Sequence, residues 1–338
     1  MNAPERTKVI IHADAGPLEG WGHLRESLEI AKALRTRGAD CLLVVPSGSP
    51  QASVEAEAEG FDVVKIPAKD WQSGGPPDTL QRLIEAIDAS FLVCDLVRVG
   101  ARYTDSIGSV CSSWAVVTEL VEDEVGAINF NIGQSPEYMP LDDAYQNAGR
   151  RATRPSIQRV LISYGGSDPR NITTATLEML RPAIGPSGPL HGVEIVVILG
   201  PLFEHTDAVQ TVAASYPATV DIVGPLTAAE MALTVAGSDI AITTAGGTMY
   251  EFCALGLPSL VVPIAEKHDT NARVLEKRGI VVRANMHDQL TAEEIKDAVV
   301  RLAPEQTRAA MSAAAQQEID GKGAARIASR LCDEWGIG

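Results

Sequence analysis

The chain has 338 residues, of which 45% are hydrophobic and 21% are charged, and its formal net charge is −16. This composition is typical of a globular protein and excludes an intrinsically disordered chain. The length suggests two domains. An acidic surface repels phosphates and anionic lipids, so we expect neither nucleic acid nor a membrane as a partner.

Three further features indicate a cytoplasmic protein. No apolar run reaches the roughly 18–20 residues that a membrane span needs. The amino terminus enters a predicted strand after a few polar residues and lacks the apolar region of a secretory signal. The five cysteines are scattered, odd in number and without a CxxC pair, so we expect reduced thiols and no metal site.

The first half alternates short apolar runs with amphipathic stretches. After a strand at 8–14, apolar residues at helical spacing predict a helix over 23–38. Further strands are expected at 41–47, 61–67, 91–96, 114–120 and 128–133, with helices at 54–60 and 79–89. Near-continuous apolar strands alternating with helices predict a buried parallel sheet with helices on both faces.

The alternation breaks at residues 134–156, which carry prolines and charges without a clear period. We interpret this segment as a linker and predict domains 1–150 and 151–338. A second series of strands is expected at 158–166, 193–200, 219–224, 239–247 and 258–264, and three helical stretches follow from residue 291. The sequence thus predicts an α/β fold of two doubly wound, Rossmann-like halves that face each other across a cleft.

Ligands of open α/β sheets bind beyond the carboxyl ends of the strands, so the loops there are the candidate sites. The first loop runs from Asp14 to His23 and contains Gly20 and Gly22, which let backbone approach a ligand closely. His23 falls at a helix start, whose positive end disfavours a charged ring and suits a neutral general base. A capping or packed histidine is the alternative.

Two glycine-rich loops belong to the second half. The first contains Gly165, Gly166, Ser167 and Asn171. It opens a helix whose backbone N–H groups can bind an anion, although a tight turn with an aspartate cap is the alternative. The second contains Gly246, Gly247, Thr248 and Glu251. Its helix start can hold a diphosphate, and its carboxylate can accept two hydroxyl protons from a ribose; a surface glutamate is the alternative.

Polar residues after other strands complete the candidates. Lys267, His268 and Asn271 follow the strand at 258–264 and could contact a sugar or phosphate. Asp95 and Glu119 follow strands of the first half and could face the cleft from the sugar or acceptor side. Each of these residues could equally be a cap or a solvated side chain.

Several common enzyme classes do not fit. The segment Gly20-Trp-Gly22-His23 lacks the third glycine of a dinucleotide fingerprint, and the second strand ends without an acid, so a nicotinamide dehydrogenase is excluded. The chain contains no P-loop motif and no G-x-S-x-G elbow. Its six histidines show no metal-ligand spacing, and no cofactor is implied.

These loops resemble those of the GT-B superfamily, and within it the UDP-sugar hydrolases of pseudaminic acid biosynthesis. The spacing D-x5-G-x-G-H from Asp14 to His23 matches that family's first motif, and the GGSD segment at 165–168 matches its second. Residues 243–271 resemble the donor-binding region of the lipid-II N-acetylglucosaminyltransferase family.

The resemblance implies specific roles. The histidine activates water in the hydrolases, and a nucleotide binds the second domain with its diphosphate near Gly246–Thr248 and its ribose near Glu251. The last helix of such enzymes often crosses back onto the first domain. The chain also departs from the hydrolases, since Glu26 stands where they carry an arginine and Thr118-Glu119 replaces a paired aspartate.

We therefore predict an inverting, metal-independent enzyme that breaks the anomeric C–O bond of a UDP-sugar and transfers the sugar to a small acceptor. His23 is the expected general base, with Asp14 beside it. The alternatives are a UDP-sugar hydrolase, in which water is the acceptor, and a protein that binds a sugar nucleotide without turnover.

Overall fold

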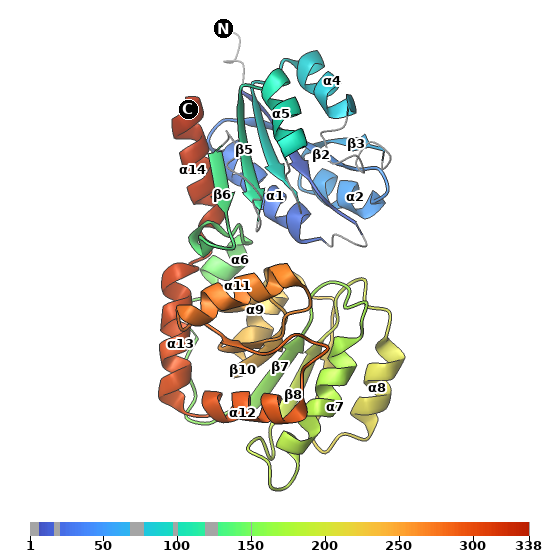
Figure 1. Cartoon of the computed structure of the whole chain (residues 1–338), viewed down its shortest axis with the longest axis vertical. Helices are drawn as coiled ribbons and strands as arrows, with labels where there is room; N and C mark the ends of the chain where they lie inside the picture. Colours follow the sequence, from blue (N-terminus) through green and yellow to red (C-terminus); the bar gives the residue numbers. More distant parts are fainter. Residues whose placement is uncertain are drawn as a thin grey trace. The chain divides into compact units, whose positions relative to one another are not determined.

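The computed structural model describes residues 7–16, 21–67, 78–96, 101–118, 128–149 and 151–337 (Figure 1). The chain divides into two compact units: unit 1 is Met1–Leu141 with Lys322–Gly338, and unit 2 is Asp142–Gly321. The predicted boundary at 150 differs from this division because the segment taken as a linker contains helix α6 (Asp143–Asn147), which packs on helices α9 (Ala228–Ala236) and α10 (Gly247–Ala254) of unit 2.

Unit 1 is built on a six-stranded parallel sheet with the order β3-β2-β1-β4-β5-β6. Its strands are β1 (Lys8–Ala13), β2 (Asp40–Pro46), β3 (Asp62–Ile66), β4 (Phe91–Asp95), β5 (Ser113–Thr118) and β6 (Ile128–Asn131). Its helices are α1 (Gly22–Thr36), α2 (Pro50–Ala58), α4 (Asp78–Ile87), α5 (Ala101–Val110), the 3-10 helix η1 (Pro136–Tyr138) and α14 (Gly323–Trp335). The strand order reverses between β1 and β4, which is where a doubly wound sheet opens a crevice for ligands.

Unit 2 repeats this topology in a second parallel sheet of six strands, with the order β12-β11-β10-β7-β8-β9. Its strands are β7 (Arg159–Ser163), β8 (Glu194–Ile198), β9 (Val220–Val223), β10 (Ile240–Thr243), β11 (Ser259–Val261) and β12 (Val282–Arg283). Besides α6, α9 and α10, its helices are α7 (Ile172–Ile184), α8 (Thr206–Ala214), α11 (Glu266–Lys277), α12 (Ala292–Leu302) and α13 (Glu305–Glu318). Here the order reverses between β7 and β10.

The predicted architecture of two doubly wound halves is confirmed, and each predicted strand is present within a few residues. The pattern missed α5, α6 and β12. Helix α5 contains Gly108 and the weak helix formers Thr104 and Ser106, α6 has five residues, and β12 has two. No helix in the described part of the chain is both long and apolar enough to cross a membrane.

The last helix, for which the resemblance implied a crossing back onto the first domain, packs in unit 1. Ile327 and Leu331 of α14 are fully buried, and the helix lies against α1. The Trp335 ring stacks on Phe91 with 4.7 Å between ring centroids. Helix α1, on which α14 packs, covers one face of the sheet, and α4 and α5 cover the other (Figure 1).

The start of α14 fits tightly against unit 1. A Cβ added at Gly323 would lie 2.0 Å from the Met139 carbonyl oxygen, which is far inside contact distance. We expect Gly323→Ala to lower the free energy of unfolding by about 3 kcal/mol, because the backbone of one of these segments must shift. Urea unfolding measures the effect. Gly108→Ala is the matched control, since a Cβ there meets nothing within 4 Å; equal stability of both variants would contradict the packing.

A buried polar cluster in unit 1 joins His12 of β1 and Cys94 of β4 to Tyr103 of α5. The Nδ1 atom of His12 lies 2.6 Å from the Tyr103 hydroxyl, and the Cys94 Sγ lies 3.3 Å from the same oxygen. Burial lowers the pKa of His12 to about 3, so the ring is neutral at physiological pH. A neutral ring can accept a hydrogen bond from the Tyr103 hydroxyl at Nδ1, which satisfies this hydroxyl inside the core.

His12 makes the stability of unit 1 depend on pH. Its pKa in the folded protein, about 3, lies below the ordinary 6.5, so the unfolded chain binds more protons between these values. The free energy of unfolding should therefore fall as the pH drops below 6.5, with a contribution from His12 of about 1.4 kcal/mol per pH unit. In His12→Asn, whose carbonyl oxygen can accept from Tyr103, denaturation at a series of pH values should show a slope smaller by that amount. An unchanged slope would contradict a neutral His12.

Candidate functional site

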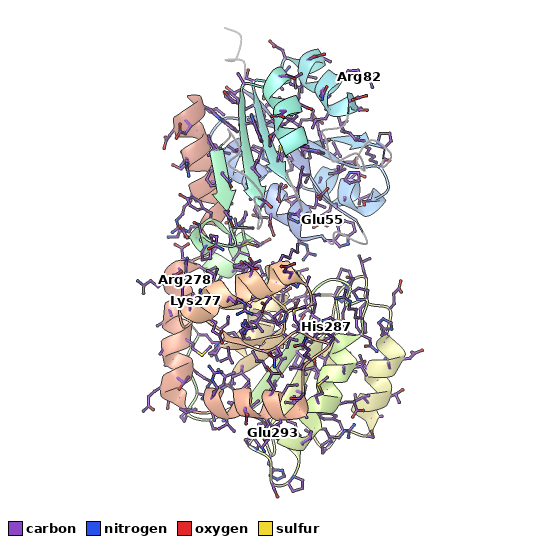
Figure 2. All side chains as sticks on the ribbon, in the orientation of Figure 1. Glu55, Arg82, Lys277, Arg278, His287 and Glu293 are labelled. Carbon is purple, nitrogen blue, oxygen red and sulfur yellow. The ribbon has the colours of Figure 1, made fainter. Side chains whose placement is uncertain are left out.

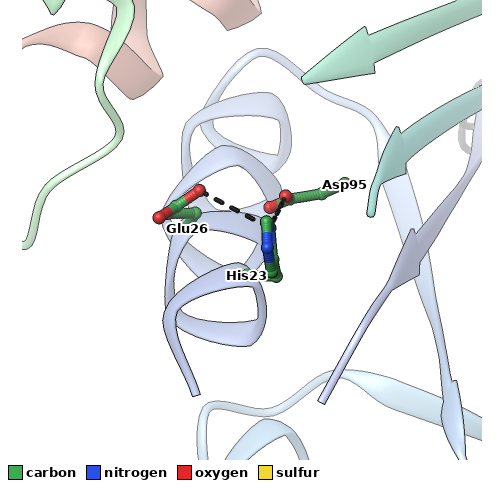
Figure 3. A group of neighbouring side chains, drawn as sticks. All are labelled: His23, Glu26 and Asp95. Atoms are coloured by element: carbon green, nitrogen blue, oxygen red, sulfur yellow. Dashed lines mark hydrogen bonds and ion pairs between the residues drawn. The ribbon is translucent and has the colours of Figure 1, made fainter. Parts of the chain in front are cut away.

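A buried histidine and aspartate meet at the carboxyl edge of the unit 1 sheet (Figure 3). Asp95 is the last residue of β4, and His23 lies in the first turn of α1, which follows β1. The two strands are neighbours at the point where the strand order reverses, so the topology brings these residues together. The His23 Nδ1 and Asp95 Oδ1 atoms lie 2.7 Å apart.

A serine completes this arrangement. Ser27 is fully buried, and its Oγ donates a hydrogen bond of 2.9 Å to Asp95 Oδ2. His23 and Ser27 are four residues apart, so they lie on the same face of α1. The Asp95 side chain is fully buried as well, and each of its two oxygens has a partner from α1.

The contact between His23 Nδ1 and Asp95 bears on which ring nitrogen carries the proton. Burial raises the pKa of the Asp95 carboxyl, while the hydrogen bonds and charge of His23 and the Ser27 hydroxyl oppose that change. When Asp95 is ionised its carboxylate only accepts hydrogen bonds, so the tautomer that fits this contact has the proton on Nδ1 of His23 and the ring lone pair on Nε2. A carboxylate in this position orients the ring and stabilises the imidazolium that forms when Nε2 takes a proton.

Glu26 places a second carboxylate beside the ring. Its Oε2 lies 4.0 Å from His23 Nδ1, and the residue is 7% exposed. One potential ligand atom from each of His23, Glu26 and Asp95 lies within 4.8 Å of the others, which is compact enough for a shared cation. However, two ligands of one small cation stand roughly 3 Å or more apart. The 2.7 Å separation of His23 and Asp95 is instead that of a direct hydrogen bond.

The basic neighbour of Glu26 belongs to a different surface. Arg25 Nε lies 3.6 Å from Oε1 of Glu55, which is labelled on α2 in Figure 2, and the arginine side chain is 56% exposed. Arg25 therefore does not take the place of the arginine that the hydrolases carry at position 26. The charge next to His23 is negative in this chain.

The other candidate residues of the first half lie in different environments. Asp14 is buried, and its backbone N–H donates to the Asp95 carbonyl oxygen at 3.0 Å, so it lies beside the pair. Gly22 is exposed, and a Cβ there would meet only Glu26 Oε1, at an ordinary 3.6 Å. The predictions for Gly20 and Glu119 fall outside the described residues.

In unit 2, the helix start at α7 is occupied by the protein itself. The Asp168 carboxylate accepts from the backbone N–H groups of Ile172 at 2.9 Å and Thr173 at 2.8 Å, and from the Thr173 hydroxyl. The side-chain oxygen of Asn171 accepts from Thr174 Oγ1 at 2.6 Å. The capped turn, which was the alternative interpretation of this loop, is what the structure contains, so these amides are not an anion site.

The helix start at α10 is open. Gly246 is the N-cap residue, and within the described residues no side chain caps the helix. A Cβ at Gly246 or Gly247 would meet nothing within 4 Å, so packing does not require glycine at either position. Gly165 lies close by, since its Cβ would be 3.9 Å from Thr248 Oγ1. The glycine loops of β7 and β10 thus adjoin where the strand order reverses, beside uncapped amides suited to an anion.

Helix α11 adds polar side chains to unit 2. The Thr244 Oγ1 and His268 Nδ1 atoms lie 3.1 Å apart, which joins the loop before α10 to α11. Asn271 is fully buried, and neither polar atom of its amide has a hydrogen-bond partner among the residues that the structure describes. Leaving such a group unsatisfied costs about 1–3 kcal/mol, so Asn271 suits a polar ligand. Glu251 and Lys267 are half-buried on α10 and α11.

Sequence reasoning missed two of these features. Ser27 carried no signal, because a serine inside a helical pattern does not indicate a partner 68 residues away. The difference between α7 and α10 was visible only as Asp168, which follows the first glycine pair and has no counterpart after the second. An aspartate just before a helix is a capping signal.

Comparison with known proteins agrees with this architecture. Residues 188–331 match the glycosyltransferase family 28 C-terminal domain. MurG of Acinetobacter baumannii superposes with a TM-score of 0.69 at 16% identity, covering 97% of this chain and 100% of that one. The spinosyn rhamnosyltransferase SpnG, complexed with thymidine diphosphate, has a TM-score of 0.61 at 18% identity, covering 96% and 99% of the two chains.

Two other proteins are similar to this chain in sequence. An uncharacterised protein of Methanocaldococcus jannaschii is 23% identical over 75% of this chain, and the match spans only 55% of that protein's length. The spore coat polysaccharide biosynthesis protein SpsG of Bacillus subtilis is 22% identical over 96% of this chain and 98% of its own. The chain therefore has the GT-B fold and carries a glycosyltransferase-type domain in its second half.

Proposed function

We propose that the chain is an inverting, metal-independent enzyme that breaks the anomeric C–O bond of a nucleoside-diphosphate sugar, with a UDP-sugar as donor, and transfers the sugar to a small acceptor. The observation that carries the proposal is the His23–Asp95–Ser27 arrangement, in which one buried carboxylate lies 2.7 Å from His23 Nδ1 and accepts from Ser27 Oγ. With Nδ1 protonated, the Nε2 atom of His23 would take the acceptor's proton as the new bond to the anomeric carbon forms and the bond to the diphosphate breaks.

Unit 2 would hold the donor. The uncapped amides at the start of α10, next to Gly165, suit the diphosphate and would stabilise its charge as it leaves. Glu251, one turn further along α10, would accept from ribose hydroxyls, and His268 and Asn271 would bind polar groups of the donor. Similar structures support this use of the fold, since SpnG is complexed with thymidine diphosphate and VinC with dTDP.

Two alternatives share these sites. If water is the acceptor, the same base makes the chain a UDP-sugar hydrolase, as the motif from Asp14 to His23 suggests. If the sugar nucleotide is bound without turnover, the chain is a binding protein. The similarity to SpsG favours a role in carbohydrate biosynthesis for the chain.

Product release from a panel of donors separates these possibilities. The protein is incubated with UDP-, dTDP-, GDP- and CMP-sugars, with and without candidate acceptors, and the products are followed by mass spectrometry. Free sugar plus nucleoside diphosphate without acceptor identifies a hydrolase, and release only with an acceptor identifies a transferase. His23→Ala should lower turnover about 10²–10⁴-fold. Unchanged turnover in this variant would refute the role of His23, and EDTA should leave turnover unchanged.

The α10 start gives a separate test of donor binding. Gly246→Ala places a methyl group in space that no described residue fills, so it should obstruct a bound diphosphate without disturbing the fold. We expect UDP to bind at least about tenfold more weakly, a loss of roughly 1.4 kcal/mol, as measured by calorimetry. Gly108→Ala in α5 is the matched control. Equal affinity of all three proteins would mean that the nucleotide does not lie at α10.

A further inference from the structure

The first two turns of α1 carry two polar residues that the proposed reaction does not itself require. We propose that Ser27 and Glu26 are positioning residues that keep the proton of His23 on Nδ1 and make the ring more basic at Nε2. This inference rests on the proposed function for its catalytic meaning, but the position of the proton can be measured without a substrate.

Ser27 acts through Asp95. A carboxylate held only at one oxygen can turn about its Cβ–Cγ bond and so lose its alignment with the ring. The 2.9 Å hydrogen bond from Ser27 Oγ to Oδ2 removes that freedom and leaves Oδ1 facing His23 Nδ1 at 2.7 Å. The bond is fully buried at both ends, so water does not compete with it.

Glu26 acts through its charge. Its Oε2 lies 4.0 Å from the nitrogen that already faces Asp95, and the residue is 7% exposed, so solvent screens this charge only weakly. A negative charge at this distance favours the imidazolium over the neutral ring. An arginine at this position, as in the hydrolases that the sequence resembles, would have the opposite effect.

Buried carboxyl groups from three elements lie in this part of unit 1. Asp14 follows β1, Glu26 belongs to α1 itself, and Asp95 ends β4. Negative charge on Glu26 and Asp95, the two that lie within 4.0 Å of His23 Nδ1, favours the protonated ring, while the positive end of α1 acts against it. Glu26 and Ser27 are the members of this group that can be changed while leaving the directly bonded pair in place.

The test is a pH titration of the His23 ring nitrogens by ¹⁵N NMR in the full-length protein, assigned with His23→Ala. The wild type should show the Nδ1–H tautomer. In Ser27→Ala a mixture of tautomers should appear, and in Glu26→Gln the tautomer should stay the same. In both variants the midpoint should move to lower pH by at least about half a unit. The acid limb of the kcat/KM profile should move with it.

Ser259→Ala is the matched control, because Ser259 is equally buried but bonds to the Leu257 carbonyl oxygen in unit 2. If Ser27→Ala does not fold, Glu26→Gln, which keeps the size of the side chain, carries the test alone. An unchanged midpoint in every folded variant overturns the inference. Full turnover in His23→Ala would instead overturn the proposed function, and the titration would still report on Ser27 and Glu26.

Discussion

The burial of the Asp95 carboxylate is the constraint that organises unit 1. A charged group that is fully removed from water is costly unless hydrogen bonds compensate it. Both compensating donors, His23 Nδ1 and Ser27 Oγ, come from one face of α1. Pairing Asp95 therefore fixes the rotation of α1 over the sheet and the orientation of the His23 ring.

Two effects act on His23, and their sizes decide its behaviour. A helix start is worth about 0.3–1 kcal/mol against a positive charge in its first turn. A hydrogen bond to a charged group is worth about 1.5–3 kcal/mol, and this one is buried. The carboxylate therefore outweighs the helix, and the basicity that the proposed function asks of His23 would come from Asp95. The helix start, on which the prediction of a neutral base at His23 was argued, is the smaller of the two effects.

The sequence was sufficient for the fold and for part of the site. Near-continuous apolar strands such as β1 that alternate with helices are typical of a buried parallel sheet, so the fold class and its layers follow from the pattern. The hydrogen-bond partners of a polar residue do not follow from the pattern, because the strand order decides which residues become neighbours. Asp95 was a candidate only as a residue at a strand end. That it bonds to His23, 72 residues earlier, depends on β1 and β4 being neighbours.

The two sheets share one strand order but offer opposite chemistry where that order reverses. In unit 1 this position is filled by carboxylates, of which Asp95 and Asp14 are buried, and a diphosphate would be repelled there. In unit 2 it has glycines and a helix that no described side chain caps, and the Asp168 carboxylate is bonded to the amides of α7. Among the described residues at these two positions, an anion is therefore favoured in unit 2 and a protonated base in unit 1. Under the proposed function, the repeated topology would hold the donor in unit 2 and the base in unit 1 through the residues that follow its strands.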